Sequence, residues 1–176
     1  MTRELSAVER ARLEQAELTY GAGGASTAGL VGPGFHSVTT SSRVGTGRER
    51  FEQAVARLLG WRMHREAGIS VRASSPVVAD GVVAVLGFGV GRLRISAPVR
   101  VVAMIDEPDR QGFAYGTLPG HPVSGEEQFL LTHQADDSVV LEISAVSRAG
   151  TPLARLGGPV TRAVQARITD RYLDSV

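Results

Sequence analysis

The most regular apolar pattern in the chain predicts an amphipathic helix over residues 46–59. Apolar side chains recur there at helical spacing and form one stripe: Phe51, Ala54, Val55, Leu58 and Leu59. Thr46 is suited to cap this helix, because Glu49 stands at the third position of a capping box. Gly60 should break or bend the helix, and residues 61–67 should form a second short helical piece.

Strand-like patterns fill the middle of the chain and predict an antiparallel sheet. A first strand is expected at residues 35–44, before the helices. Six further runs are rich in β-branched and aromatic residues: 69–73, 77–88, 92–105, 112–118, 126–133 and 138–146. The short, turn-rich connections between them favour hairpins over helical crossovers, so the sheet is predicted to be a meander.

Helical periodicity returns after Thr151 and continues to the end of the chain. One apolar stripe runs along this segment: Leu153, Leu156, Val160, Val164, Ile168 and Tyr172. Gly157-Gly158-Pro159 should kink this helix or divide it. A curved sheet with one apolar face needs a cover, and the stripe can supply it. The pattern therefore predicts an α+β fold in which a curved antiparallel sheet wraps around a long C-terminal helix.

The chain is expected to form a single domain. Its 176 residues are of ordinary domain size. Ser6 and Glu9 form a capping-box signature for a short N-terminal helix, and a glycine-rich loop follows. We expect this N-terminal part, residues 1–34, to belong to the same domain as residues 35–176.

Four segments of the sequence resemble the bacterial and plant family called domain of unknown function nineteen-ninety. The segments are Leu18-Thr19-Tyr20, Trp61-Arg62-Met63-His64-Arg65, Gly112 to Pro122 followed by Gly125-Glu126-Glu127, and Arg155 to Pro159 with Arg171-Tyr172-Leu173. The predicted order of elements also resembles the helix-grip fold of the Bet v 1 and START-related superfamily. That resemblance implies a sheet gripping the last helix, often with a cavity between them, but it implies no established activity.

Composition narrows the chemistry that the chain can perform. There is no cysteine, and all nineteen basic residues are arginine, so a thiol nucleophile, a lysine Schiff base and a Walker-type phosphate loop are excluded. The net charge of +1 gives no strong field for nucleic acid. The glycines of residues 87–91 precede a strand-like run rather than a helix, which favours a hairpin over a dinucleotide site. We therefore expect no cofactor and no nucleic-acid partner.

Metal, hydrolase and membrane signals are also missing from the sequence. The four histidines, His36, His64, His121 and His133, are dispersed, so no metal site is predicted. No Gly-x-Ser-x-Gly elbow is present. The first residues are charged rather than leader-like, and the longest apolar run, residues 82–91, is too short to cross a bilayer. A cytoplasmic location without a membrane span is expected.

The densest group of aromatic, imidazole and carboxylate residues lies in residues 105–129. Strand alternation places Glu127 on the face of Phe129 and Leu131, and Glu126 on the more polar face. A carboxylate on an inner face needs a partner. Either Glu127 pairs with Arg100 or Arg94 at the end of the sheet, or it meets a ligand.

Six further residues complete the set of candidate ligand-binding positions. Phe113 and Tyr115 share one strand face, and Trp61 and His64 share one helix face. Core packing, helix capping and an exposed turn are the competing interpretations for these positions and for His121. The ligand-binding candidates, together with Glu127, are Trp61, His64, Phe113, Tyr115, His121 and Phe129.

The leading hypothesis is a binding module for a small, largely apolar molecule held between the sheet and the C-terminal helix. Pockets of this kind are mostly apolar and carry a few placed polar groups. One alternative is an enzyme that uses Glu127 or His121 as general acid or base on such a molecule. The other alternative is a structural or protein-interaction domain with a filled core.

Overall fold

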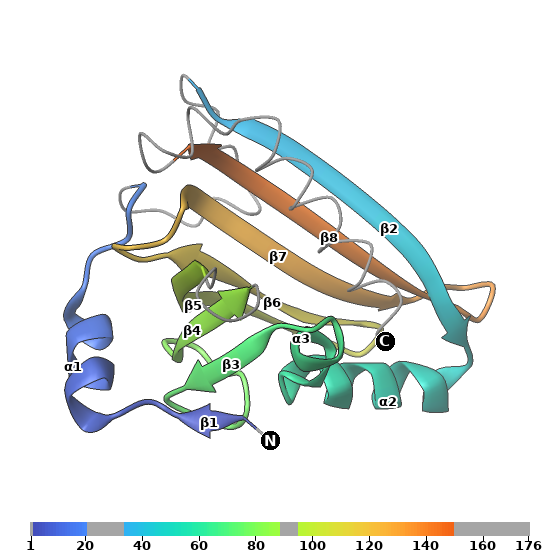
Figure 1. Ribbon diagram of the computed structural model, residues 1–176. Coiled ribbons are helices and arrows are strands. Elements are labelled where there is room, and N and C mark those ends of the chain that lie inside the picture. The colour runs from blue at the N-terminus through green and yellow to red at the C-terminus, as the bar shows by residue number, and fades with distance from the viewer. Residues whose placement is uncertain (1, 21–33, 89–94, 150–176) are drawn as a thin grey trace.

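A computed structural model describes residues 2–20, 34–88 and 95–149 of the chain. In these residues eight strands form one curved sheet with the order β1-β3-β4-β5-β6-β7-β8-β2 (Figure 1). The strands are β1 (Arg3–Glu4), β2 (His36–Thr46), β3 (Ser70–Ala73), β4 (Val83–Phe88), β5 (Ile95–Glu107), β6 (Arg110–Thr117), β7 (Val123–His133) and β8 (Ser138–Ala149). The helices are α1 (Ala7–Gln15), α2 (Arg48–Leu59) and α3 (Arg62–Glu66).

The predicted meander is confirmed for β3 to β8, which pair antiparallel in chain order. The first long strand, β2, joins the far edge and pairs antiparallel with β8, so that His36 lies opposite Ser147. At the other edge the two residues of β1, which the sequence pattern did not predict as a strand, pair parallel with β3. The sheet is therefore mixed.

The stripe predicted for the central helix is confirmed, since four of its five residues are buried: Phe51, Ala54, Val55 and Leu58. The predicted cap was wrong. Thr46 is the last residue of β2 and pairs with Ser138, which leaves Gly47 as the N-cap. Gly47 has a φ of 94° that favours glycine, and its amide donates to the carbonyl of Asp137. Pairing in the sheet thus outweighed side-chain capping at Thr46.

The two faces of the sheet carry different layers. Helices α2 and α3 pack on one face, here called the inner face, and build the main core with inward residues such as Val71, Leu86 and Phe129. Helix α1 packs on the opposite, outer face, where Leu5 and Leu13 meet Val83, Val85 and Leu118. Figure 1 shows α1 and the α2–α3 pair at different sides of the sheet.

Three sequence predictions fall outside the described residues: the C-terminal helix with its break at Gly157-Gly158-Pro159, the glycine-rich loop and the Gly89-Val90-Gly91 turn. The glycines at residues 87–91 lead toward β5, which begins at Ile95 opposite Phe88. A strand therefore follows them, as the hairpin interpretation requires. No helix among the described residues is both long and apolar enough to span a membrane.

Candidate ligand-binding site

A row of side chains crosses the inner face of five adjacent strands and passes from the core to the exposed edge. Register places Val101 on β5, Tyr115 on β6, Glu127 on β7, Ala145 on β8 and Val38 on β2 directly opposite one another. Residues opposite each other in a ladder share a face. Val101 is 1% exposed and Val38 is 64% exposed. Glu127 therefore stands between a closed and an open part of the sheet.

Tyr115 donates a hydrogen bond from its hydroxyl to a carboxylate oxygen of Glu127. The predicted inward position of both side chains is confirmed by this contact. Burial raises the pKa of Glu127, while the hydrogen bond from Tyr115 opposes that rise. Glu127 is surrounded by protein yet keeps part of its surface exposed. Burial thus favours the protonated carboxyl group, and the hydrogen bond from Tyr115 favours the carboxylate.

Aromatic rings form a cluster beside the Tyr115–Glu127 pair. The ring of Phe129 lies 5.4 Å from that of Phe113, 5.6 Å from that of Tyr115 and 5.1 Å from that of His64, measured between centroids. Trp61 meets Phe113 edge-on at 5.7 Å. Such geometries stabilise aromatic pairs beyond the area that they bury. The structure thus brings together six of the seven candidate residues.

Trp61 and His64 of this cluster lie at the start of helix α3 and within it. Trp61 is the N-cap of α3 with a left-handed backbone, at a φ of 58°, which turns the chain sharply after Gly60. His64 is fully buried, and burial lowers its pKa to about 3. The His64 ring is therefore neutral over the physiological pH range. It packs as part of the cluster and provides no positive charge there.

His121 lies apart from the cluster, in the loop between β6 and β7. Its Nδ1 atom is 2.9 Å from the carbonyl of Val123 and 3.1 Å from the Val123 amide. Burial lowers the pKa of His121 to about 4. Its ring thus has a local partner in the turn, and a role in binding stays a prediction.

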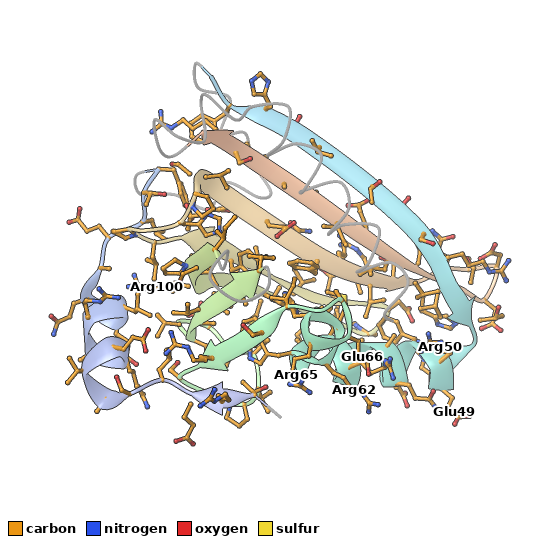
Figure 2. All side chains as sticks on the ribbon, in the orientation of Figure 1. Glu49, Arg50, Arg62, Arg65, Glu66 and Arg100 are labelled. Carbon is orange, nitrogen blue, oxygen red and sulfur yellow. The ribbon has the colours of Figure 1, made fainter. Side chains whose placement is uncertain are left out.

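The expected ion pair between Arg100 and Glu127 was wrong, because the two side chains lie on opposite faces. Arg100 is opposite Gly116, and Gly116 is opposite Glu126, so this row belongs to the outer face. There Arg100 donates to the carbonyls of Leu13, Glu14 and Ala16 at distances of 2.6, 3.0 and 2.8 Å. Figure 2 shows Arg100 beside α1. Arg94, the other expected partner, lies outside the described residues.

The outer face opposite the candidate site is covered by the segment Leu18-Thr19-Tyr20, which the sequence did not place. Tyr20 lies over Gly116 and next to Glu126. The Tyr20 pKa is raised mainly by burial and also by the neighbouring Glu126. Glu126 and Gln128 are only 3% and 7% exposed. The face that looked more polar in sequence is thus a second buried layer.

Hydrogen bonds fasten this segment to the ends of β6 and β7. The Thr19 amide donates to the Thr117 carbonyl at 3.0 Å, and the hydroxyls of the two threonines lie 2.5 Å apart. Ser124 donates to the Thr19 carbonyl at 3.1 Å, and the Gly125 amide donates to the Thr117 hydroxyl at 3.0 Å. Thr19, Thr117 and Gly125 belong to segments that carried the family resemblance, and Ser124 lies between two of those segments. That shared motif was the sequence signal that could have indicated their contact.

The described residues do not hold a group of three or more histidine, aspartate or glutamate side chains that could bind a metal ion. On the inner face, the arrangement combines one carboxyl group, one phenol and several aromatic rings. Such a set can accept a hydrogen bond, exchange a proton and contact an apolar body.

Solved structures share this architecture. The chain is similar to a hypothetical protein from Helicobacter pylori, with 13% identity, a TM-score of 0.56 and coverage of 81% of this chain and 88% of that one. It is also similar to truncated norcoclaurine synthase from Thalictrum flavum, with 13% identity, a TM-score of 0.55 and coverage of 79% and 91%. At these identities the likeness shows the fold alone. The protein therefore has an α+β fold of the helix-grip type.

The chain belongs to the family described as Domain of unknown function (DUF1990), whose model matches residues 19–175. A UPF0548 protein of Deinococcus radiodurans is 40% identical over 140 residues, which cover 74% of this chain and 71% of that protein. A UPF0548 protein of Dictyostelium discoideum is 30% identical over 135 residues, covering 70% of this chain and 62% of that relative. The resemblance found in the sequence is thereby confirmed.

Proposed function

We propose that the protein binds a small, largely apolar molecule on the inner face of the sheet, with Glu127 and Tyr115 as its polar contact. The observation that carries this proposal is the position of Glu127. Its carboxyl group is held by Tyr115 at the boundary between the closed aromatic cluster and the partly exposed strands β8 and β2 of the inner face. Burying a carboxyl group costs stability, and ionisable groups of this kind are concentrated at functional sites.

The neighbouring side chains support a ligand at this boundary. Ala145 and Ser147 on β8 are small and partly exposed, and they continue the inner face beyond Glu127. Toward the core, Phe129 and Tyr115 offer apolar surface to the same region. A ligand there would bury its apolar part against rings and place one polar group at Glu127.

Native mass spectrometry of the purified protein tests this proposal. We expect an additional mass that is released when the protein is denatured. Glu127→Gln should lose most of this mass, because the substitution keeps the shape of the side chain and removes its charge. Glu142→Gln is the matched control, since Glu142 lies on β8 opposite Leu130, on the outer face. A clean protein mass, together with no binding to an apolar compound library, would instead support a filled-core structural domain.

A second candidate function is proton transfer by Glu127 on the bound molecule. The specific observation is the raised pKa of Glu127 together with the hydrogen bond from Tyr115, because a general acid or base works best with a pKa near the working pH. The two functions differ in the Glu127→Gln variant. Lost affinity supports binding alone, whereas retained affinity with lost conversion of the bound molecule supports catalysis.

A further inference from the structure

We propose that the molecule bound at Glu127 carries a protonated amine at one end of its apolar body. This inference rests on the proposed function and names the chemical class of the ligand. Three features support an amine: the charges around Glu127, the aromatic rings beside it, and the small number of carboxylate oxygens, which disfavours a metal ion.

No basic side chain neutralises Glu127 in the part of the chain that the structure describes. None of the ion pairs there includes Glu127. Arg100 is held by the carbonyls of α1 on the outer face. His64 is in the aromatic cluster but is neutral, and His36 is exposed on β2, two strands away from β7. Among residues 2–20, 34–88 and 95–149, no side chain thus supplies a positive charge at Glu127, and a ligand can supply one.

Tyr115 already favours the ionised form of the carboxyl group, because its hydroxyl donates to one carboxylate oxygen. Burial acts in the opposite direction and favours the neutral form. An ammonium group at Glu127 would offset the burial penalty by a charge-assisted hydrogen bond. A neutral hydroxyl or carbonyl group would not do so, and a ligand carboxylate would be repelled.

Aromatic rings next to Glu127 suit the same class of ligand. Tyr115 lies directly opposite Glu127 on β6, and Phe129 is two residues further along β7; both side chains are on the inner face. Ring faces attract cations within about 6 Å of the ring centre. A metal ion would need several oxygen ligands. The described residues provide no cluster of three acidic or histidine ligands, so an organic cation fits better.

The test compares two probes of the same skeleton, phenylpropylamine and phenylpropanol, by isothermal titration calorimetry at neutral pH. We expect the amine to bind the native protein about tenfold more tightly than the alcohol, as one charge-assisted hydrogen bond would give. Glu127→Gln should lose this preference while its affinity for the alcohol changes by less than about threefold. Glu142→Gln should keep the preference, because it removes an equal charge from the outer face.

Tyr115→Phe provides a second variant in case Glu127→Gln does not fold. Tyr115→Phe removes the hydroxyl that favours the ionised carboxylate of Glu127, so the preference for the amine should become smaller. Equal binding of the two probes to the native protein would overturn the inference and leave the proposed function standing. Binding of neither probe, with no co-purifying molecule, would overturn both. A co-purifying molecule that lacks a basic nitrogen would overturn the inference alone.

Discussion

The hydroxyl of Tyr20 lies directly over Gly116, and no side chain larger than hydrogen fits between them. A Cβ atom at Gly116 would be 2.1 Å from the Tyr20 hydroxyl oxygen and 2.9 Å from Cδ2 of Leu18. Gly116 is not among the glycines with a positive φ. It is therefore needed for the close approach of the N-terminal segment and not for an unusual backbone conformation.

Gly116→Ala should destabilise the protein by about 1–3 kcal/mol, because the added methyl group must displace the buried Tyr20 ring. Chemical denaturation measures this change. In a Tyr20→Leu background the same substitution should be much milder, since residues in contact do not contribute additively. Equal losses in both backgrounds would show that the Tyr20 contact does not account for the glycine.

Arg100→Gln should release the end of α1 from the sheet. The Arg100 guanidinium holds three backbone carbonyls, and hydrogen bonds from charged groups contribute roughly 1.5–3 kcal/mol. We expect a loss of that order and faster amide hydrogen exchange in residues 13–20. Arg110→Gln is the matched control, because its partner Glu107 is as exposed as Arg110 itself, and it should change stability by less than about 0.5 kcal/mol. Unchanged exchange in Arg100→Gln would contradict the prediction.

Glu127→Gln should leave the protein at least as stable as the native form at neutral pH. Burial raises the Glu127 pKa above the ordinary value of 4.5, so between these two pKa values the folded state binds more protons than the unfolded state. The contribution of Glu127 to stability therefore decreases as the pH rises through that window. Glutamine lacks this titration. Thermal melts at several pH values check the sign, and a strong destabilisation at neutral pH would indicate a purely structural role.

Acid should unfold the protein partly through His64. Its pKa falls from 6.5 to about 3 on folding, so the unfolded state binds more protons between these values. Stability from this residue is complete above pH 6.5 and is lost as the pH falls toward 3. His64→Gln should flatten that dependence, which amounts to several kcal/mol at about 1.4 kcal/mol per pKa unit. His121→Gln, with a native pKa of about 4, should flatten it less.

Periodicity predicted most elements of the fold because they depend on local spacing. Apolar residues recur every three or four positions in α2 and every second position in β6 to β8, which are the repeats of a helix and of a strand. Strand β1 has only two charged residues, Arg3 and Glu4. It pairs with β3 beside the ion pair between Glu9 of α1 and Arg72, and both are tertiary contacts without a local pattern.

The sequence was sufficient to predict the strand face on which Glu127 lies, but not the side chain that pairs with it. Alternation alone placed Tyr115 and Glu127 inward, and their hydrogen bond confirms it. The partner of Glu127 depends on register between strands, which decides that Arg100 shares a face with Gly116 and Glu126. Likewise, Glu126 is buried by Tyr20, which lies more than a hundred residues earlier in the chain. Alternation within β7 alone cannot predict that contact.

The pairing of β2 with β8 also affects how the protein can be made. His36 pairs with Ser147, which is synthesised more than a hundred residues later. Strand β2 can therefore join the sheet only when most of the chain has been made. Until then an eleven-residue strand has unpaired backbone amides and carbonyls. Its sequence is rich in serine and threonine and poor in large apolar residues. This composition suits a nascent strand that must remain unpaired without aggregating.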